Sequence, residues 1–321
     1  MNKFKYYFIL SITTLSLFSC SKSDDTIELT PAREYSEQYP TDLSDIEEYL
    51  TSNYITVTNH PGFSDDQDVT ITKIPTGGTQ PSIMSYLNKT TFPKLLVREV
   101  KLHDLTYKLY YLALREGSGD KPSNVDNVLT SYKGVYLSRV TGTDAVSTLT
   151  STDFEEQKFP QSTLSLYGTI RGWKEVFPQF RTGTSNGNAD GTVSYSDFGA
   201  GVMFIPSGLG YYSQSQGTIP SYSPLVFSFK LYALVRSDLE IRNVGTSIFS
   251  DPDGILSYLE DIDGDGYVWR ADELPTDAVN PDDTDGDGVP DFLDIDDDGD
   301  GFTTKAELAA GTNYLDKNSH P

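Results

Sequence analysis

The chain has 321 residues, enough for one large domain or for two to three smaller ones. Its formal net charge is −23, and residues 251–307 hold most of it, with twenty Asp and Glu against two Lys and Arg, a net −18. This acidity argues against nucleic-acid binding, which needs basic patches that neutralise phosphates. It predicts instead a multivalent cation as partner, or a solvated, disordered tail.

The first twenty residues have the pattern of a targeting segment. Lys3 and Lys5 precede an apolar stretch, residues 6–18, that is too short to span a bilayer comfortably. The sequence LFSC, which ends at Cys20, resembles the lipobox of bacterial lipoproteins, and Cys20 is the single cysteine of the chain. The resemblance implies a cleaved signal peptide (1–19), a lipid on Cys20, and an outer-membrane lipoprotein that faces the periplasm or the cell surface. An ordinary secretory signal with a chance cysteine is the alternative.

Residues 20–41 are polar, contain two prolines and are predicted to form a linker. A helix is expected to follow, because Ser44 and Glu47 have the spacing of a capping box. Its apolar face would consist of Leu43, Ile46, Tyr49 and Leu50. No chemical motif occurs in residues 42–105, where a strand is expected over 69–74. We interpret this region as an N-terminal extension that packs on the next domain or serves in dimerisation.

Residues 106–236 are predicted to form short β-strands around one helix. Strands are expected over 107–114, over 202–205 and over 225–234, with a pair of strands in 125–137 that ends near Val140. The helix is expected over 170–180. Five or six strands wrapped on one helix define an α+β fold in which the sheet buries the helix on its concave face.

Three segments of this region, taken in order, resemble the core of the FKBP-type peptidyl-prolyl isomerases. They are LSLYGTIRGWKEVFPQ at 164–179, IPSGLGYY at 205–212 and TIPSYSPLVFSFKL at 218–231. The sequences LREGSG at 114–119 and SYKG at 131–134 extend the similarity. The resemblance implies an antiparallel FKBP-like sheet wrapped on a short helix, and isomerase activity toward proline-containing polypeptide clients without any cofactor.

The resemblance also implies which residues form the proline-binding pocket. The backbone N–H of Ile170 and the hydroxyl of Tyr211 would bind substrate carbonyls, and Glu155 stands where the family has an aspartate. The full predicted set is Tyr132, Phe154, Glu155, Ile170, Trp173, Tyr211, Ile219 and Phe227. Without the family pattern, these aromatic residues would be interpreted as ordinary core.

Such a pocket has a physical rationale. Partial double-bond character gives a prolyl amide a rotation barrier of about 18–20 kcal/mol. Twisting the bond removes resonance and reduces charge separation, so a dry aromatic pocket suits the twisted state better than the planar one. The sequence predicts a membrane-anchored isomerase that aids the folding of exported proteins. Two alternatives remain open, namely a proline-binding module with little turnover and an adhesin-like assembly component.

The acidic tail, predicted to span 245–321, repeats the 1-3-5-6-12 spacing of calcium loops. Asp251, Asp253 and Glu260 form a partial further loop. The loops resemble thrombospondin type 3 or dockerin-like repeats, and structural Ca²⁺ is expected to order them. An acidic low-complexity tail is the alternative. The predicted ligands are Asp261, Asp263, Asp265 and Asp272; Asp283, Asp285, Asp287, Asp291 and Asp294; and Asp296, Asp298, Asp300, Glu307 and the carbonyl of Phe302.

The segment 182–200 contains weaker calcium-loop spacing. Asn186, Asn188, Asp190 and Asp197 fit positions 1, 3, 5 and 12, but only two of them are carboxylates. A glycine-rich hairpin turn is the preferred interpretation.

Overall fold

The computed structural model describes residues 31–143, 145–244, 246–275 and 278–321. The predicted signal peptide, Cys20 and the first part of the predicted linker lie outside the described residues. The chain divides into Met1–Ala32 and Arg33–Pro321, and every element below belongs to the second unit. Among the described helices, none has the length and apolar character needed to cross a membrane.

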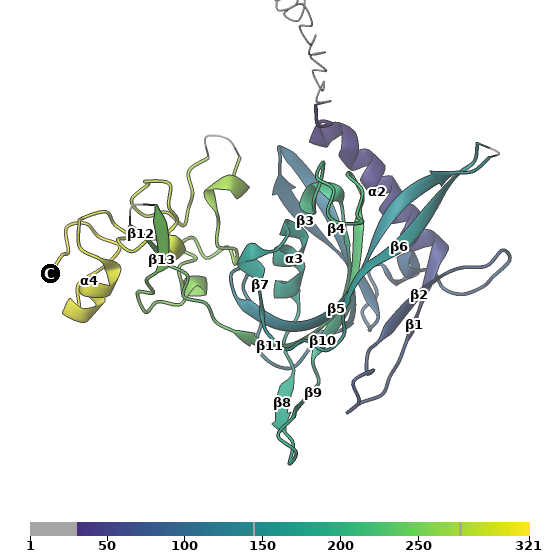
Figure 1. Ribbon diagram of the computed structural model, residues 1–321, viewed down its shortest axis with the longest axis horizontal. Helices are drawn as coiled ribbons and strands as arrows, with labels where there is room; N and C mark the ends of the chain where they lie inside the picture. The colour runs from purple at the N-terminus through teal and green to yellow at the C-terminus, as the bar shows by residue number, and fades with distance from the viewer. Residues whose placement is uncertain (1–30, 144, 245, 276–277) are drawn as a thin grey trace, which may run out of the picture. The chain divides into compact units, whose positions relative to one another are not determined.

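An antiparallel sheet of seven strands curls around the short helix α3, Arg171–Val176, as Figure 1 shows. Its order is β3-β4-β10-β11-β5-β6, and the short β7 pairs with β5. This mixture of helix and curled antiparallel sheet agrees with the predicted α+β, FKBP-like class. The strands are β3 Lys94–Leu102, β4 Leu105–Arg115, β5 Asn127–Thr141, β6 Ser147–Gln157, β7 Leu164–Ser165, β10 Gly199–Ile205 and β11 Leu225–Val235.

Most of the predicted strands are confirmed, with one correction. The segments 107–114, 202–205 and 225–234 lie within β4, β10 and β11. The predicted pair of strands in 125–137 is wrong, because β5 is one strand that continues to Thr141 and pairs along its length with β6. β3, from the predicted N-terminal extension, pairs with β4, so the expected boundary at residue 105 falls between two strands of one sheet.

The sheet has an apolar core on each face. Met203 and Ile205 of β10 join the cluster around α3, whereas Val202 and Phe204 join the cluster under α2, Tyr35–Ser52. Successive side chains of a strand point to opposite faces, so a strand covered on both sides is apolar throughout. Every residue of β10 is buried for this reason.

The helix α2 begins ten residues earlier than the sequence predicted, because its N-cap is Glu34 and not Ser44. Ser44 lies inside the helix instead of capping it, and Pro40 lies inside as well, so the end of the predicted linker is helical. A proline near the start of a helix removes one hydrogen bond, and burial of the face that carries Gln38 and Asp42 offsets that loss. A hairpin of β1, Asn53–Val57, and β2, Val69–Lys73, follows, which confirms the strand expected over 69–74.

Asp42 anchors α2 to the turn after β10 and gives the fold a predicted pH dependence. It is 1% exposed and accepts hydrogen bonds from the Ser207 N–H (2.7 Å), the Ser207 hydroxyl (2.6 Å) and Gln38 (2.7 Å). Burial raises the pKa of Asp42 to about 6, although these hydrogen bonds act in the opposite direction.

Because the folded protein binds this proton more tightly than the unfolded chain, Asp42 stabilises the fold below about pH 4, and that contribution is lost as the pH rises through about 6. This contribution of Asp42 to the free energy of unfolding is about 3 kcal/mol. Between about pH 4 and pH 7, the unfolding free energy of the wild type should therefore decrease by about 3 kcal/mol more than that of Asp42→Asn, as measured by urea unfolding. Equal pH slopes for the two proteins would contradict the prediction.

Gly172 allows α3 to pack directly on β10. A Cβ atom at this position would lie 2.6 Å from Cγ2 of Ile205, a side chain with no exposed surface. We expect Gly172→Ala to lower the unfolding free energy by about 1–3 kcal/mol, since overpacking outweighs the helix propensity gained. Gly168→Ala is the control, because a Cβ there meets nothing within 4 Å. Thermal unfolding that ranks the two variants the other way would refute this account.

The remaining elements lie outside the main sheet. The hairpin of β8, Thr184–Gly187, and β9, Val193–Ser196, confirms the hairpin interpretation of segment 182–200, and Asp190 accepts hydrogen bonds from the N–H and hydroxyl of Thr192. The tail contains β12 Ile241–Val244, β13 Ser247–Ser250 and α4 Thr304–Ala310. The 3-10 turns are Ile83–Tyr86, Leu166–Gly168, Phe177–Gln179, Ser207–Leu209, Ser257–Leu259, Ala271–Glu273 and Asp291–Leu293.

Candidate functional site

A cleft of about 190 Å³ lies where the start of α3 meets strands β5, β6 and β11. Six of the eight predicted pocket residues line it. β5 supplies Tyr132, β6 supplies Glu155, β11 supplies Phe227 and α3 supplies Trp173. The full lining is Tyr132, Glu155, Leu164, Gly168, Thr169, Ile170, Trp173, Tyr211 and Phe227.

Edge-to-face ring contacts fix the aromatic side of the cleft. The Trp173 ring is 4% exposed and meets Tyr132 at 5.0 Å between centroids and Phe227 at 5.1 Å, with interplanar angles of 82° and 89°. Phe154 meets Phe227 at 5.5 Å and 89°. Such T-shaped pairs place the positive edge of one ring on the negative face of the next, which holds the rings in defined orientations. The lining is therefore a preorganised apolar surface centred on Trp173.

Gly134, in the SYKG segment, makes room for these rings. It lies opposite Phe227 on one side and opposite Glu155 on the other. A Cβ atom at Gly134 would lie 2.4 Å from Cζ of Phe154 and 2.8 Å from Cε1 of Phe227. Any side chain at this position would therefore displace Phe227 from the cleft wall and Phe154 from its place behind that wall.

Four polar groups belong to the residues of the cleft, namely the hydroxyls of Tyr132 and Tyr211, the Glu155 carboxylate and the Ile170 N–H. The Tyr132 hydroxyl donates to Oε1 of Glu155 at 2.9 Å. The pKa of Tyr132 is raised, mainly because the residue is partly buried and secondly because of this hydrogen bond. Burial, together with the Glu155 charge, also raises the pKa of Tyr211, whose hydroxyl makes no hydrogen bond to a described residue. The N–H of Ile170, the N-cap of α3, likewise makes no hydrogen bond to the described residues. Two donors are thus free to bind carbonyl oxygens.

Two predicted residues lie behind the lining, and three lining residues were not predicted. Phe154 packs against Phe227, and Ile219 is buried in the same apolar cluster. Leu164, Gly168 and Thr169 line the cleft without having been selected. β7, which contains Leu164, has two residues, too few for any periodicity to reveal. Gly168 and Thr169 directly precede Ile170, and this adjacency was the available signal.

The three predicted calcium loops share one internal hydrogen-bond pattern. In each, the glycine at position 6 has positive φ and donates its N–H to the aspartate at position 1: Gly266 to Asp261 (2.9 Å), Gly288 to Asp283 (3.0 Å) and Gly301 to Asp296 (3.0 Å). Position 5 likewise donates to position 3, and position 7 donates to position 5. The same turn geometry therefore brings the carboxylates at positions 1, 3 and 5 together in each of the three loops.

The carboxylates at positions 1, 3 and 5 form three clusters whose oxygens lie within 4.8 Å of one another. Buried oxygens of Asp261, Asp296, Asp298 and Asp300 have no hydrogen-bond partner among the described residues, nor has Oε2 of Glu307. An all-carboxylate donor set with unpartnered oxygens fits a hard divalent cation such as Ca²⁺. The clusters are Asp261, Asp263 and Asp265; Asp283, Asp285 and Asp287; and Asp296, Asp298 and Asp300.

The other predicted ligands differ in their surroundings. Both oxygens of Asp272 accept from Arg270 at 2.9 Å, so an ion pair occupies this carboxylate. Asp291 accepts from Thr284, and Asp294 accepts the N–H groups of Ile295 and Asp296. Phe302 donates its N–H to Asp300 and stacks its ring on His320. The geometry is most complete in the third loop, where Glu307 has an unpartnered buried oxygen.

The first loop and the residues after it contact α3. Lys174 binds Glu273 at 2.8 Å, and Arg171, which binds Glu175 at 2.7 Å, stacks over the Tyr267 ring at 4.0 Å. The Asn124 side chain exchanges two hydrogen bonds with the backbone of Val268, at 2.8 and 3.0 Å. The helix that lines the cleft therefore also anchors the tail.

Comparisons with known proteins give a partial match. The BamM C-terminal family model matches residues 250–319, which lie in the acidic tail. Its description mentions no calcium repeat, so the resemblance to thrombospondin type 3 repeats stays a prediction. A search of curated proteins finds no match.

Three similar solved structures have low TM-scores. The first is a peptidyl-prolyl cis-trans isomerase from Pseudomonas syringae pv. tomato, with 17% identity over 64% of this chain and 99% of that chain and a TM-score of 0.34. The second is FkpA from Escherichia coli, with 26% identity over 40% of this chain and 48% of that chain and a TM-score of 0.28. The third contains the three FKBP domains of wheat FKBP73, with 14% identity over 40% of this chain and 47% of that chain and a TM-score of 0.29. The chain thus spans about half of the last two. TM-scores this low do not establish a common fold, so the function proposed below depends on the residues of the cleft.

Proposed function

We propose that this protein is a peptidyl-prolyl cis–trans isomerase that acts on proline-containing polypeptide clients. The observation that carries the proposal is the preorganised ring surface around Trp173, with Tyr132 and Phe227 edge-on against it and two unpartnered donors at its rim. A prolyl ring is apolar and flat enough to enter such a cleft. The site chemistry requires no nucleophile, because no covalent bond to the protein forms.

Catalysis would follow from preferential binding of the twisted amide. The planar amide has a large dipole that water solvates well, whereas the twisted amide has lost resonance and much of that dipole. The apolar wall formed by Trp173 and Phe227 therefore disfavours the planar state relative to the twisted one. The Ile170 N–H and the Tyr211 hydroxyl would hold the carbonyls on either side of the rotating bond and fix the axis of rotation.

The tail and the N-terminus extend the proposal. The tail would bind Ca²⁺ as a structural ion through its three carboxylate clusters. The lipobox-like sequence supports anchoring through a lipid on Cys20. The match of residues 250–319 to the BamM C-terminal family suggests a link to the outer-membrane assembly machinery. Together these features support an outer-membrane location for an isomerase that assists exported proteins.

A protease-coupled assay with a proline-containing chromogenic peptide tests the activity. The purified full chain is expected to accelerate cis–trans exchange, and the Tyr132→Ala variant to do so less. If the chain binds proline peptides in a fluorescence titration but leaves exchange at the uncatalysed rate, it is a binding module and the enzyme proposal fails. If it neither binds nor accelerates, the cleft is not a proline site.

Glu155 offers a test of what the Tyr132 hydrogen bond contributes. Glu155→Gln keeps an acceptor oxygen for the Tyr132 hydroxyl, whereas Glu155→Ala removes it. A hydrogen bond to a charged group contributes about 1.5 kcal/mol or more. We therefore expect about a tenfold loss of kcat/KM in Glu155→Ala and less than a threefold loss in Glu155→Gln. Equal losses in the two variants would show that charge, rather than orientation of Tyr132, is what matters.

A further inference from the structure

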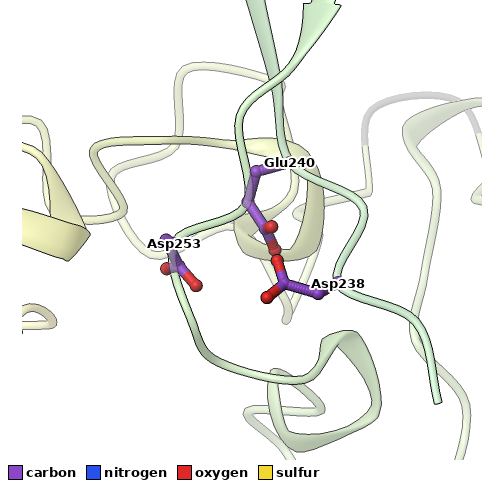
Figure 2. Close-up of side chains that lie close together, drawn as sticks. All are labelled: Asp238, Glu240 and Asp253. Atoms are coloured by element: carbon purple, nitrogen blue, oxygen red, sulfur yellow. The ribbon is translucent and has the colours of Figure 1, made fainter.

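A group of five carboxylates, four of them buried and Asp238 half-buried, lies outside the 1-3-5 clusters of the three calcium loops. Asp238 and Glu240 follow β11, Asp253 follows β13, Glu260 follows a 3-10 turn, and Asp297 occupies position 2 of the third loop. The group forms two triads, Asp238–Glu240–Asp253 and Asp253–Glu260–Asp297. Within each triad, ligand oxygens lie within 4.8 Å of one another, and Asp253 belongs to both. Figure 2 shows the side chains of the first triad converging from separate segments.

Four of these carboxylates are buried, and eight of the ten oxygens of the group are buried without a hydrogen-bond partner among the described residues. Glu240 is 0% exposed, and Glu260 and Asp297 are each 1% exposed. Both oxygens of each of the three lack a hydrogen-bond partner among the described residues, as do Oδ1 of Asp238 and Oδ2 of Asp253. The other oxygen of Asp253 accepts the N–H of Ile255 at 2.6 Å. The first triad and the second triad therefore each aim several unsatisfied oxygens at one point.

The group has no ion-pair partner among the described residues. None of the five carboxylates forms a salt bridge with a Lys or Arg of the described residues. Burial raises the pKa of Asp253, and the charge of Lys305, which donates to the Pro252 carbonyl at 3.0 Å, only partly opposes this effect. Burying an ionised carboxylate costs several kcal/mol unless it is paired or coordinates a metal. Five such groups together require either protons or bound cations.

We propose that the five carboxylates bind two Ca²⁺ ions, one in each triad, with Asp253 as a ligand shared between them. The donors are all hard carboxylate oxygens, with no His or Cys, which favours Ca²⁺ over softer metals. Two divalent ions would neutralise four of the five charges. Asp253 and Glu260 belong to the partial further loop of the sequence. The proposed sites are nevertheless separate from those of the three complete loops, because Asp238 and Glu240 precede the loops and Asp297 occupies position 2, which the loop spacing does not use.

The two sites would fasten the segment after β11 to the tail. Asp238 and Glu240 directly follow the last strand of the main sheet, whereas Glu260 and Asp297 belong to the loop region. Ions held between them would cross-link chain positions that are almost sixty residues apart. The proposal does not depend on isomerase activity, since the same cross-link would form in a binding module.

Counting bound ions in the full chain tests the proposal. After equilibrium dialysis against Ca²⁺, the bound metal is measured by elemental analysis for wild type, Glu240→Gln, Glu260→Gln and Asp253→Asn. We expect one ion fewer in each glutamine variant and two fewer in Asp253→Asn. Glu99→Gln, at an exposed position outside the tail, is the matched control and should match wild type. Unchanged counts in all three variants, or a loss of one ion in each, would overturn the shared-ligand arrangement.

A second measurement separates loss of a site from loss of folding. The loop variant Asp285→Asn should lose one ion by itself, and the double variant with Glu240→Gln should lose two if the sites are separate. A variant that had unfolded would lose all tail ions at once and the near-ultraviolet signal of Trp269. If Glu240→Gln binds as many ions as wild type with that signal intact, Glu240 is not a ligand and the proposal is wrong.

Discussion

Replacement of Trp173 by alanine is expected to lower kcat/KM for prolyl isomerisation by at least tenfold. Trp173 contacts three aromatic rings of the cluster, namely Tyr132, Phe177 and Phe227, so its removal eliminates the surface that faces the prolyl ring. The same change should lower the free energy of unfolding by about 3–5 kcal/mol, as large-to-small core substitutions do. Activity would be measured per folded molecule by the protease-coupled assay, and stability by urea unfolding.

Phe204→Ala is the matched control for this prediction. Phe204 has no exposed surface and lies in the apolar cluster on the α2 side of the sheet, away from the cleft. It should lose comparable stability while its folded molecules keep wild-type kcat/KM. If both variants lose activity equally, the loss reflects weakened folding, and Trp173 has no special role in rotation of the bond.

Removal of Ca²⁺ by a chelator is expected to unfold residues 251–321 while the main sheet stays folded. Among the described residues of this segment, only Tyr267, Val268 and Phe292 are buried hydrophobic side chains. A core this small cannot offset the chain entropy of some seventy residues, each of which costs about 1–2 kcal/mol to order. It also cannot offset the repulsion among closely spaced carboxylates. Burial of Asp297, for example, raises the pKa of that carboxyl to about 8. We therefore expect bound cations to supply the difference.

Limited proteolysis with and without chelator would measure this effect. The chelated protein should lose the tail rapidly and leave a stable fragment that ends near Val235, whereas the Ca²⁺-bound protein should resist cleavage. Near-ultraviolet circular dichroism should lose the contribution of Trp269, which packs on Tyr267 at 4.7 Å, and keep that of Trp173. A tail that resists cleavage equally well in both conditions would show that it folds without metal.

Local patterns predicted the parts of the fold and of the site that depend on residues close in sequence. The segments around Tyr132, Trp173 and Phe227 identified the aromatic lining, and the alternating strands located β4, β10 and β11. The 1-3-5-6 spacing identified three carboxylate clusters, because each loop closes on itself within a few residues.

Features that depend on contacts between distant segments could not be predicted in this way. The true start of α2 depends on burial of Gln38 and Asp42 against the turn at Ser207, and Pro40 misled the sequence interpretation. Asp253 and Glu260 were predicted only as part of a partial further loop, and Asp238, Glu240 and Asp297 were missed because no spacing rule connects them with it. The burial of these carboxylates becomes evident only in the folded chain. The same is true of the absence of a Lys or Arg salt bridge to them among the described residues.

One helix serves two binding surfaces at once. α3 presents Trp173 to the cleft and Arg171 and Lys174 to Glu273 and Tyr267 of the acidic tail. If α3 moves when the tail detaches, binding of calcium to the tail and binding of a client to the cleft are coupled. Thermodynamic linkage then requires that each ligand changes the affinity of the protein for the other by the same factor. The proposed isomerase would then respond to the calcium concentration, and a bound client would in turn change the affinity of the tail for its ions.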